Sequence, residues 1–282
     1  MLLLDGKVIS DKFKEELKEI VEEEKDNGVK FKLCIISVGG DEACSTYVKN
    51  KLKACEYIGI KPLYMPLPEE ITQEQLIDFI NMYNCDDDVT GIIVQLPLPK
   101  HIDKHEVAMH IDSLKDVDGF NPINVGNIYL GNDAIYPCTP RGIMNILNHY
   151  NIDIEGKECV VVGRSNIVGK PMAMELLAAN GTVTICHSKT KNLKEICKRA
   201  DILVCAIGSP KFFNEEYVKD GAVVIDVGIH RVDNKLCGDV DFDAVKDKVY
   251  AITPVPGGVG PMTVACLMDN VVYSALEQHG EW

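Results

Sequence analysis

The sequence predicts an α/β protein built from two domains. Strand-like apolar runs alternate with helix-like segments along most of the 282 residues, and one stretch rich in Gly, Asn and Pro, residues 115–132, interrupts this alternation. Continuous apolar strands that alternate with helices indicate parallel sheets with helices on both faces. We therefore expect one α/β domain before the interruption and a second one after it.

The first series of elements starts with KLCIISVG, an apolar strand at residues 32–39. The segment from Ala43 to Gly59 contains no proline and ends at a glycine, which favours a helix. The elements expected next are a strand at 61–67, a helix at 71–84 and a strand at 90–99. The loop-rich stretch 115–132 then marks the domain junction, so we expect a first domain of residues 1–120.

The second series has the order expected of a Rossmann-like nucleotide-binding domain. Its expected strands are 158–163, 182–187, 201–208 and 222–228, and its expected helices are about 168–180 and 192–200. We expect this domain to span residues 138–263. A helical tail follows from Thr263 to Gln278, and residues 264–282 are expected to pack back onto the first domain.

Charge and composition exclude several classes of function. A net charge of −14 argues against binding to nucleic acid. The N-terminal segment MLLLDGK is not a secretory signal, and no stretch approaches about 20 apolar residues, so we expect no membrane partner and a cytoplasmic location. The eleven cysteines form no C-x-x-C pair and lie mostly in apolar runs. They are expected to be buried reduced thiols, and no metal site is predicted.

One lysine lies in an unexpected place. On a helical wheel of residues 43–59, Lys51 falls inside the apolar half, and Tyr47 lies one turn before it on the same face. Lys51 could simply extend its ammonium to water past its buried methylenes. Alternatively it is a catalytic lysine, because burial favours the neutral amine, which can accept a proton.

A candidate phosphate-binding loop joins the strand at 158–163 to the next helix. ECVVVGRSNIVGKPMAM contains Gly163, Ser165 and Gly169, which allow a tight turn and close approach to the amides of a helix N-terminus. The spacing is G-x-S-x-x-x-G rather than G-x-G-x-x-G, so an ordinary strand–turn–helix junction remains an alternative.

The next strand indicates which dinucleotide would bind. NAD-selective Rossmann domains usually carry an acidic residue after the second strand, to hold the ribose 2′-hydroxyl. Here Ser188 and Lys189 follow that strand without a carboxylate, and Arg164 lies in the first loop. An arginine, a hydroxyl and a lysine suit a 2′-phosphate, which favours NADP over NAD.

Several segments resemble those of the bifunctional methylenetetrahydrofolate dehydrogenase (NADP+)/methenyltetrahydrofolate cyclohydrolase family. The matching segments, in order, are STYVKNKLKACEYIGI, TGIIVQLPLPKHI, KDVDGFNPINVG, CTPRGI, VVVGRSNIVGKPMA, TICHSKT, ADILVCAIGSP, VVIDVGIHR, GDVDF and TPVPGGVGPMT. They cover nearly the whole chain. The resemblance implies an N-terminal catalytic domain, a C-terminal Rossmann-like NADP-binding domain, a folate-binding cleft between them and a homodimer.

The resemblance also implies a role for individual residues. Lys51 matches the catalytic lysine, the general acid/base of the cyclohydrolase step, and Tyr47, Gln95 and Asp118 match the other catalytic positions. Tyr47 would stack on the pterin, Gln95 would orient the amine and Asp118 would bind pterin N–H groups. The expected tetrahydrofolate-binding residues are Tyr47, Lys51, Gln95, Leu96, Pro97, Asp118, Val255, Pro256, Gly257 and Gly258. The expected NADP-binding residues are Gly163, Arg164, Ser165, Ile167, Val168, Gly169, His187, Ser188, Ile207, Gly208, Ile229 and Thr263.

The implied reactions are two consecutive one-carbon interconversions. NADP⁺ would oxidise 5,10-methylenetetrahydrofolate to the 5,10-methenyl cation, and water would then convert this cation to 10-formyltetrahydrofolate. Taken one by one, the residues could have purely structural roles, since an aspartate in DVDG often forms a turn and a glutamine after a strand often caps a sheet. Two alternative functions also remain: a two-domain dehydrogenase acting on an amino acid or a shikimate-like acid, and a non-catalytic NADP-binding sensor.

Overall fold

The computed structural model describes the backbone of residues 1–39 and 42–280, and the side chains of residues 1–39 and 46–280. The chain divides into two compact units. Unit 1 comprises Met1–Ser10 and Thr139–Thr263, and unit 2 comprises Asp11–Cys138 and Val264–Trp282. The expectation that the first domain begins at residue 1 is wrong, because β1 (Leu2–Leu3) pairs with β11 (Ala251–Ile252) in the sheet of unit 1.

Unit 2 contains a three-stranded parallel sheet with the order β3-β2-β4. Two long helices, α1 (Gly6–Asp26) and α10 (Val259–His279), each begin in unit 1 and continue in unit 2. The other elements are β2 (Lys32–Val38), α2 (Glu42–Ile58), β3 (Lys61–Leu67), α3 (Gln73–Asn84), β4 (Gly91–Val94), α4 (Lys104–His110) and α5 (Pro122–Leu130).

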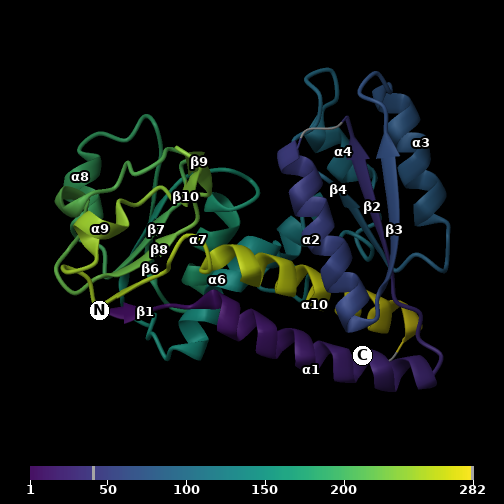
Figure 1. The fold of residues 1–282 in the computed structure, drawn as a ribbon, viewed down its shortest axis with the longest axis horizontal. Coiled ribbons are helices and arrows are strands. Elements are labelled where there is room, and N and C mark those ends of the chain that lie inside the picture. The colour runs from purple at the N-terminus through teal and green to yellow at the C-terminus, as the bar shows by residue number, and fades with distance from the viewer. Residues whose placement is uncertain (40–41, 281–282) are drawn as a thin grey trace. The chain divides into compact units, whose positions relative to one another are not determined.

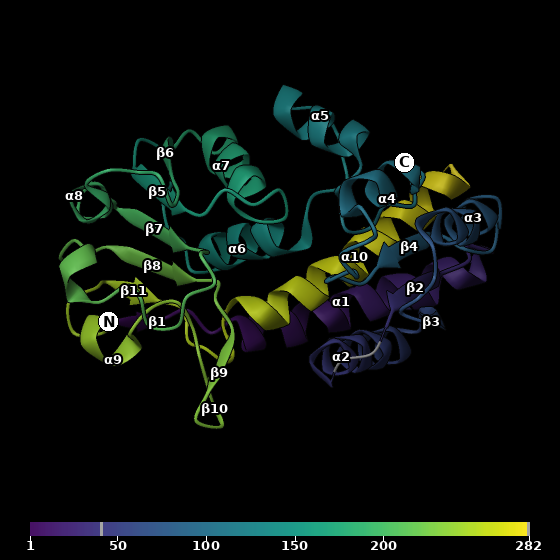
Figure 2. The ribbon, with the colours of Figure 1, turned by 90° about the horizontal axis from the view of Figure 1, so that it is seen from above.

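In unit 2, β2 and β4 are buried on both faces, as their apolar sequences require, whereas most residues of the edge strand β3 are exposed or half-buried. On one face, alternate residues of β2 (Cys34, Ile36 and Val38) pack against α3 and α4. On the other face, α2 contacts α10 through the Cys55 Sγ and Met268 Sδ atoms, which lie 3.6 Å apart. Figure 1 shows α2 and α3 on opposite sides of the three strands, and Figure 2 shows the unit 2 portions of α1 and α10 side by side.

The stretch expected to be loop-rich contains a helix, α5, so that part of the prediction is wrong. The Asn121 side chain accepts a hydrogen bond from the Ile123 amide, Pro122 begins the helix, and Gly131 ends it in the left-handed conformation at φ 74°. An N-cap, a proline in the first turn and a terminal glycine are helix boundary signals. The same residue types also favour turns, so they do not distinguish a short helix from a loop.

Unit 1 contains a six-stranded parallel sheet with the order β1-β11-β8-β7-β5-β6. A separate antiparallel hairpin is formed by β9 (His230–Val232) and β10 (Lys235–Cys237). The other elements are α6 (Cys138–His149), β5 (Glu158–Val162), α7 (Gly169–Ala178), β6 (Thr182–Cys186), α8 (Leu193–Cys197), β7 (Ile202–Cys205), the 3-10 helix η1 (Glu215–Tyr217), β8 (Val223–Asp226) and α9 (Phe242–Val245).

The strand order of unit 1 reverses between β5 and β7, which are neighbours in the sheet although β6 follows β5 in sequence. In open parallel sheets, ligands bind outside the carboxyl ends of the strands at such a reversal. The loops that follow β5, β6, β7 and β8 all lie at this edge because the strands are parallel. The predicted Rossmann-like arrangement is therefore present.

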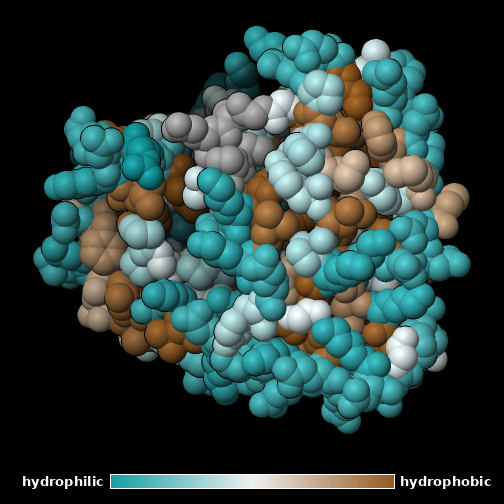
Figure 3. Space-filling model, turned by 45° about the vertical axis from the view of Figure 1, so that its right-hand side comes forward, coloured by the Kyte–Doolittle hydropathy of each residue, from teal (hydrophilic) through white to brown (hydrophobic). Residues whose placement is uncertain are grey.

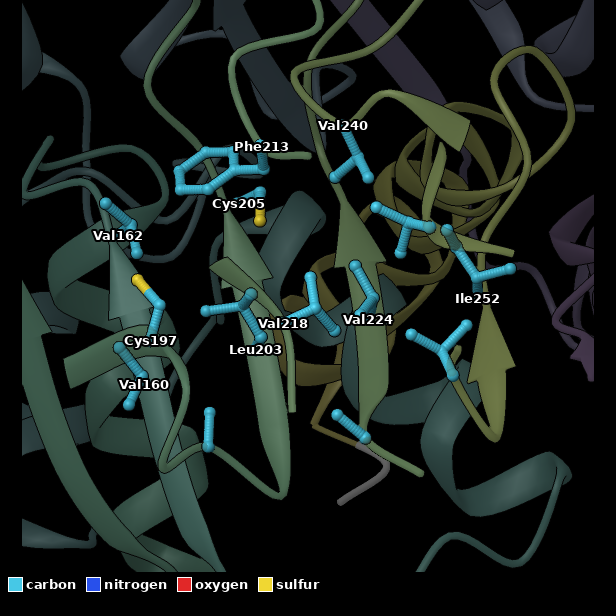
Figure 4. Close-up of a cluster of buried hydrophobic side chains, with 14 of the residues drawn as sticks. Val160, Val162, Cys197, Leu203, Cys205, Phe213, Val218, Val224, Val240 and Ile252 are labelled. Atoms are coloured by element: carbon cyan, nitrogen blue, oxygen red, sulfur yellow. The ribbon is translucent and has the colours of Figure 1, made fainter. Parts of the chain in front are cut away.

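The core of unit 1 fills the space between the sheet and two of its helices. Residues of β5, β7, β8 and β11, among them Val160, Leu203 and Val224, pack against Cys197 of α8 and Val245 of α9. Figure 4 shows most of this cluster, with Phe213 covering Cys205 at one end. The other face of the sheet packs on α7, which contacts both β5 and β6.

The polarity of the surface and the burial of the cysteines are those expected from the sequence. Hydrophilic side chains cover most of the face drawn in Figure 3, and hydrophobic ones lie between them in small groups. Among the described residues, one helix, α10, has the length and hydropathy of a membrane span, and 67% of its most apolar window is buried in the protein, as in a core helix. Of the described cysteines, all are free, and all but Cys85 and Cys237 are buried, as predicted; Cys44 lies outside the described side chains.

Candidate active site

The helix that carries Lys51 has the two faces that the helical wheel predicted. Val48, Cys55 and Ile58 are buried, whereas Lys49 and Lys53 are exposed. Lys51 lies on the apolar side and is partly buried. Tyr47 differs from its neighbours on that side, because it lies near the edge of the apolar face and 46% of it is exposed.

The Lys51 ammonium contacts one specific partner. Its Nζ donates a hydrogen bond of 2.9 Å to Oε1 of Gln95, the residue that follows β4. The Gln95 amide is held in turn, because its backbone N–H donates to the Ile36 carbonyl of β2 at 2.8 Å and its Nε2 donates to the Leu96 carbonyl at 2.7 Å. The sheet edge therefore fixes the oxygen that binds Lys51, and the cis Leu96–Pro97 bond follows directly.

Asp118 lies in a segment that runs beside β4. Asp116 forms a parallel bridge with Ile92, and a turn at Gly119, with φ 73°, follows Asp118. A Cβ on Gly119 would lie 2.7 Å from the Ile135 carbonyl oxygen, so this turn requires glycine. Burial raises the pKa of the Asp118 carboxyl, and the positive charge of Lys51 acts in the opposite direction. Unit 2 thus brings Lys51, Gln95 and Asp118 together.

The first aspartate of the DVDG segment has a different environment from the second. Asp116 is buried and accepts hydrogen bonds from the Asn121 amide at 2.6 Å and from Asn124 Nδ2 at 3.1 Å. Burial raises its pKa to about 7. Asp116 therefore holds the start of α5, while Asp118, two residues later, faces the lysine. The sequence interpretation singled out Asp118 and missed the role of Asp116.

The loop after β5 in unit 1 has the close backbone packing that a phosphate-binding turn needs. A side chain on Gly169 would overlap the backbone of Gly163 and Arg164, and Gly163 adopts φ 140° against Ala206. The Ser165 hydroxyl accepts hydrogen bonds from the amides of Val168 at 3.1 Å and Gly169 at 3.4 Å, which ties the loop to the start of α7. The glycines thus allow the close backbone packing of a strand–turn–helix junction, the place at which Rossmann domains bind the diphosphate of a dinucleotide.

The positions predicted to bind the 2′-phosphate are open to solvent. Arg164 and Ser188 are exposed, and Ser188 lies in the loop after β6. The His187 amide in that loop donates to the Thr190 hydroxyl at 2.8 Å, and the Lys189 amide donates to His187 Nδ1 at 3.1 Å. The loop backbone is therefore fixed while the Arg164 and Ser188 side chains remain available to a ligand.

Three isoleucines are exposed at the carboxyl edge of the same sheet. Ile167 follows β5, Ile207 follows β7 and Ile229 follows β8, and their exposed fractions are 39%, 37% and 43%. Exposed apolar side chains in loops of this kind suit a ligand with flat rings, such as a nicotinamide dinucleotide. All three are among the residues predicted from the sequence to bind NADP.

The remaining predicted positions lie in unit 1 as well. Val255–Pro256 is a second cis peptide bond, and the Gly257 carbonyl accepts a hydrogen bond of 2.9 Å from the Lys7 amide. Gly258 packs so closely on Gly6 that a Cβ at position 6 would overlap its carbonyl. The Thr263 hydroxyl lies 3.1 Å from the Thr139 hydroxyl. The predicted folate residues are thus divided between unit 2 (Tyr47 to Asp118) and unit 1 (Val255 to Gly258).

Sequence reasoning missed two buried carboxylates near the predicted cofactor loops, Asp226 and Asp239. Both are buried and accept hydrogen bonds from backbone amides of several segments. The available signal was the pairing of D-x-G in VVIDVG with G-D in CGDV. Among the described residues, no group of three or more His, Cys, Asp or Glu could hold a metal ion.

The chain matches both domain descriptions of one enzyme family. The description "Tetrahydrofolate dehydrogenase/cyclohydrolase, catalytic domain" matches residues 4–118, and "Tetrahydrofolate dehydrogenase/cyclohydrolase, NAD(P)-binding domain" matches residues 137–279. The bifunctional protein FolD of Lachnoclostridium phytofermentans is 62% identical over 97% of this chain and 98% of its own length.

Solved structures of the same enzyme family also match the chain. The bifunctional enzyme FolD of Campylobacter jejuni is 52% identical, with a TM-score of 0.97 over 98% of this chain and 99% of its own. The Trypanosoma brucei dehydrogenase–cyclohydrolase, which was solved with NADP and an inhibitor, is 36% identical, with a TM-score of 0.93 over 98% of each chain.

These matches cover nearly all of the chain and overturn the alternatives of an amino-acid or shikimate dehydrogenase and of a non-catalytic sensor. The fold class, the bifunctional enzyme and the nicotinamide dinucleotide cofactor that the sequence predicted are confirmed. The chain belongs to the tetrahydrofolate dehydrogenase/cyclohydrolase family.

Proposed function

We propose that Lys51 is the general acid/base of the cyclohydrolase step in an NADP-dependent enzyme that converts 5,10-methylenetetrahydrofolate to 10-formyltetrahydrofolate. One observation carries this proposal: the Lys51 ammonium lies on an apolar helix face, bonded at 2.9 Å to Gln95 and close enough to Asp118 for its charge to oppose the rise that burial causes in the pKa of that carboxyl. A solvated surface lysine would have neither neighbour.

The geometry suits a proton carrier that works twice. Hydrolysis of the methenyl cation requires a group to take a proton from the attacking water and a group to return one as the ring opens. Gln95 orients the Lys51 amine through an uncharged acceptor, the side-chain oxygen Oε1, at 2.9 Å. Lys51 is the group proposed to carry the proton in both directions.

Tyr47 and Asp118 are proposed to position the pterin. The exposed Tyr47 ring lies one helical turn before Lys51, where a flat heterocycle could stack on it. The Asp118 carboxyl could accept hydrogen bonds from pterin N–H groups. The Leu96–Pro97 segment beside Gln95 and the Val255–Gly258 segment are proposed to complete substrate binding.

NADP is the proposed dinucleotide, supported by the exposed Arg164 and Ser188 and by the absence of a carboxylate in the sequence Ser188–Thr190. When bound, NADP⁺ would supply the hydride acceptor for the dehydrogenase step. The protein's own contribution is to bind the diphosphate at Gly163–Gly169 and to cover the rings with the exposed isoleucines. Unit 1 is therefore the proposed dinucleotide domain, and unit 2 carries the proposed acid/base. We further propose a homodimer in the cytoplasm, on the basis of the family resemblance and the composition.

A coupled assay tests this function directly. The purified chain is incubated with 5,10-methylenetetrahydrofolate and either NADP⁺ or NAD⁺, while the absorbance of the methenyl product and its decay are followed separately. We expect formation of the methenyl product with NADP⁺, followed by hydrolysis. If NAD⁺ supports equal or faster turnover, the NADP assignment is wrong, and if the methenyl product accumulates without enzyme-dependent decay, the cyclohydrolase assignment is wrong.

A further inference from the structure

The loop after β7 and the loop after β8 in unit 1 meet at one buried side chain. Asp239, which follows the β9–β10 hairpin, is fully buried. Its Oδ2 accepts hydrogen bonds from the amides of Ile207 at 2.7 Å and Gly208 at 3.0 Å. Its Oδ1 accepts from the Ser209 amide at 2.9 Å and lies 2.8 Å from His230 Nε2.

The partners of this carboxylate come from two of the three segments that hold the exposed isoleucines, those of Ile207 and Ile229. Ile207 and Gly208 belong to the first segment, and His230 is the residue after Ile229 in the second. Asp239 is therefore a bridge between two loops at the carboxyl edge of the sheet. One carboxylate can satisfy three consecutive amides because each of its two oxygens can accept more than one hydrogen bond.

A second buried carboxylate holds the backbone of Asp239 itself. Asp226, at the end of β8, accepts hydrogen bonds from the amides of Gly228 at 3.1 Å, Asp239 at 2.8 Å and Val240 at 3.0 Å. The Asp226 amide donates to the buried Thr253 hydroxyl at 2.8 Å. The sheet end thus fixes Asp226, and Asp226 fixes Asp239.

The two glycines in this region are explained by the two carboxylates. A Cβ on Gly228 would overlap Asp239, and a Cβ on Gly238 would overlap the Asp226 carboxyl. Each glycine therefore leaves room for the aspartate of the other segment. The backbone of Phe213 pairs with the segment that contains Asp239. Its amide donates to the Asp239 carbonyl at 2.9 Å, and its carbonyl accepts from the Asp241 amide at 2.8 Å.

We propose that Asp239 is a positioning residue for the dinucleotide: its carboxylate sets the backbone of residues 207–209 and, through His230, the segment of Ile229, so that both loops are ordered before the cofactor binds. This inference rests on the proposed NADP site. It assigns Asp239 no contact with substrate or cofactor, and it concerns the dehydrogenase step, because cyclohydrolysis needs no dinucleotide.

The first test replaces the carboxylate by its amide. In Asp239→Asn, the side-chain NH₂ must face at least one backbone N–H or His230, so one loop loses its anchor. We expect the Kd for NADP, measured by titration, and the KM for NADP to rise about 10–100-fold. Hydrolysis of added methenyltetrahydrofolate should remain within a few-fold of the original rate.

A matched control separates positioning from general destabilisation. Asp201 lies at the opposite, amino end of the same sheet, where its carboxylate accepts from the Glu158 amide at 2.9 Å and from Lys219 Nζ at 2.6 Å. Asp201→Asn should lower the melting temperature of the protein but leave the NADP affinity unchanged. Equal effects of the two variants on NADP affinity would contradict the proposal.

A milder pair of variants covers the case in which Asp239→Asn does not fold. His230→Ala removes one donor from the network and should raise the KM for NADP several-fold, while His230→Gln, which can still donate a hydrogen bond, should recover part of the loss. An unchanged KM for NADP in His230→Ala and in a folded Asp239→Asn would overturn the inference. Failure of the unmodified chain to bind NADP would instead refute the proposed function.

Discussion

The two candidate sites are built in opposite ways. In unit 2, Lys51, Gln95 and Asp118 are each partly buried, and the hydrogen bond from Lys51 to Gln95 joins two of these side chains directly. At the dinucleotide loops of unit 1, the side chains proposed to contact the ligand, Arg164 and Ser188, are exposed, and the buried Asp239 fixes the backbone of another of these loops at Ile207. The geometry of the Lys51 site depends on contacts between side chains, whereas the geometry of the dinucleotide loops depends on hydrogen bonds to the main chain.

This difference follows from what each site has to do. A general acid/base must be tuned by its surroundings, so it needs neighbours that restrict its orientation and hydration. A cofactor site needs a rigid concave surface with a few free side chains at its rim. Substitutions should therefore have local, chemistry-specific effects in unit 2 and should act on cofactor binding in unit 1.

The largest expected effect comes from removing the amine in unit 2. In Lys51→Met, a side chain of similar length without a proton to exchange, we expect hydrolysis of methenyltetrahydrofolate to fall by about 10²–10⁴-fold. The affinity for NADP should be unchanged. The exposed Lys49 on the same helix provides the control, and Lys49→Met should retain normal activity. A normal hydrolysis rate in Lys51→Met would remove Lys51 from the acid/base role.

A smaller effect is expected from the exposed arginine in unit 1. In Arg164→Ala, loss of one charged hydrogen-bonding group should raise the KM for NADP about 10–100-fold. The KM for NAD should change much less, because NAD lacks the 2′-phosphate. Arg199→Ala is a suitable control, since Arg199 is also exposed but lies 3.9 Å from Glu158 at the amino end of β5. Equal changes in both KM values would exclude a 2′-phosphate contact.

The smallest effect on activity is expected at a buried carboxyl that neither site uses. Glu175 on α7 is 8% exposed, and among the described residues its Oε1 has no hydrogen-bond partner. Burial raises its pKa to about 8, although the charge of Arg141 acts in the opposite direction. The folded protein therefore keeps this proton at pH values where the unfolded chain has released it.

The consequence is a stability that falls as the pH rises. Between the ordinary glutamate pKa and pH 8, the folded state binds more protons than the unfolded state, so the free energy of unfolding decreases with pH. Glu175→Gln removes this dependence and should gain about 2–4 kcal/mol relative to the original chain between pH 5 and pH 9. Thermal melts across this range measure the difference. Parallel pH profiles for the two proteins would contradict the prediction, and the dehydrogenase rate of the variant at pH 7 should be nearly unchanged.

The comparison of sites also explains which features could be read from the sequence. The position of Lys51 was predictable because amphipathicity is local, and the glycine loop was predictable because turns and helix starts are encoded by neighbouring residues. The bond between Lys51 and Gln95 joins residues 44 positions apart. This pairing was predicted only from the family resemblance, because no local sequence pattern specifies a contact between two such distant residues.

Asp239 shows the corresponding limit for unit 1. Its partners lie 9 to 32 positions away in two loops, and its function depends on their amides, which every residue type except proline possesses. The helix α5 was missed for a different reason, because its boundary residues also favour turns. Sequence patterns thus predicted the elements and the exposed ligands better than the buried groups that hold them.

The pairing of β1 with β11 has a consequence for synthesis of the protein. Leu2 pairs with Ala251, so this strand must wait for nearly the whole chain to be translated before its partner exists. At about 5–20 residues per second, the delay is on the order of 10–50 s. The α10 segment of unit 2 emerges even later than β11. Neither unit can be completed before the other has been almost fully translated, so we expect the two units to reach their final folds at about the same time.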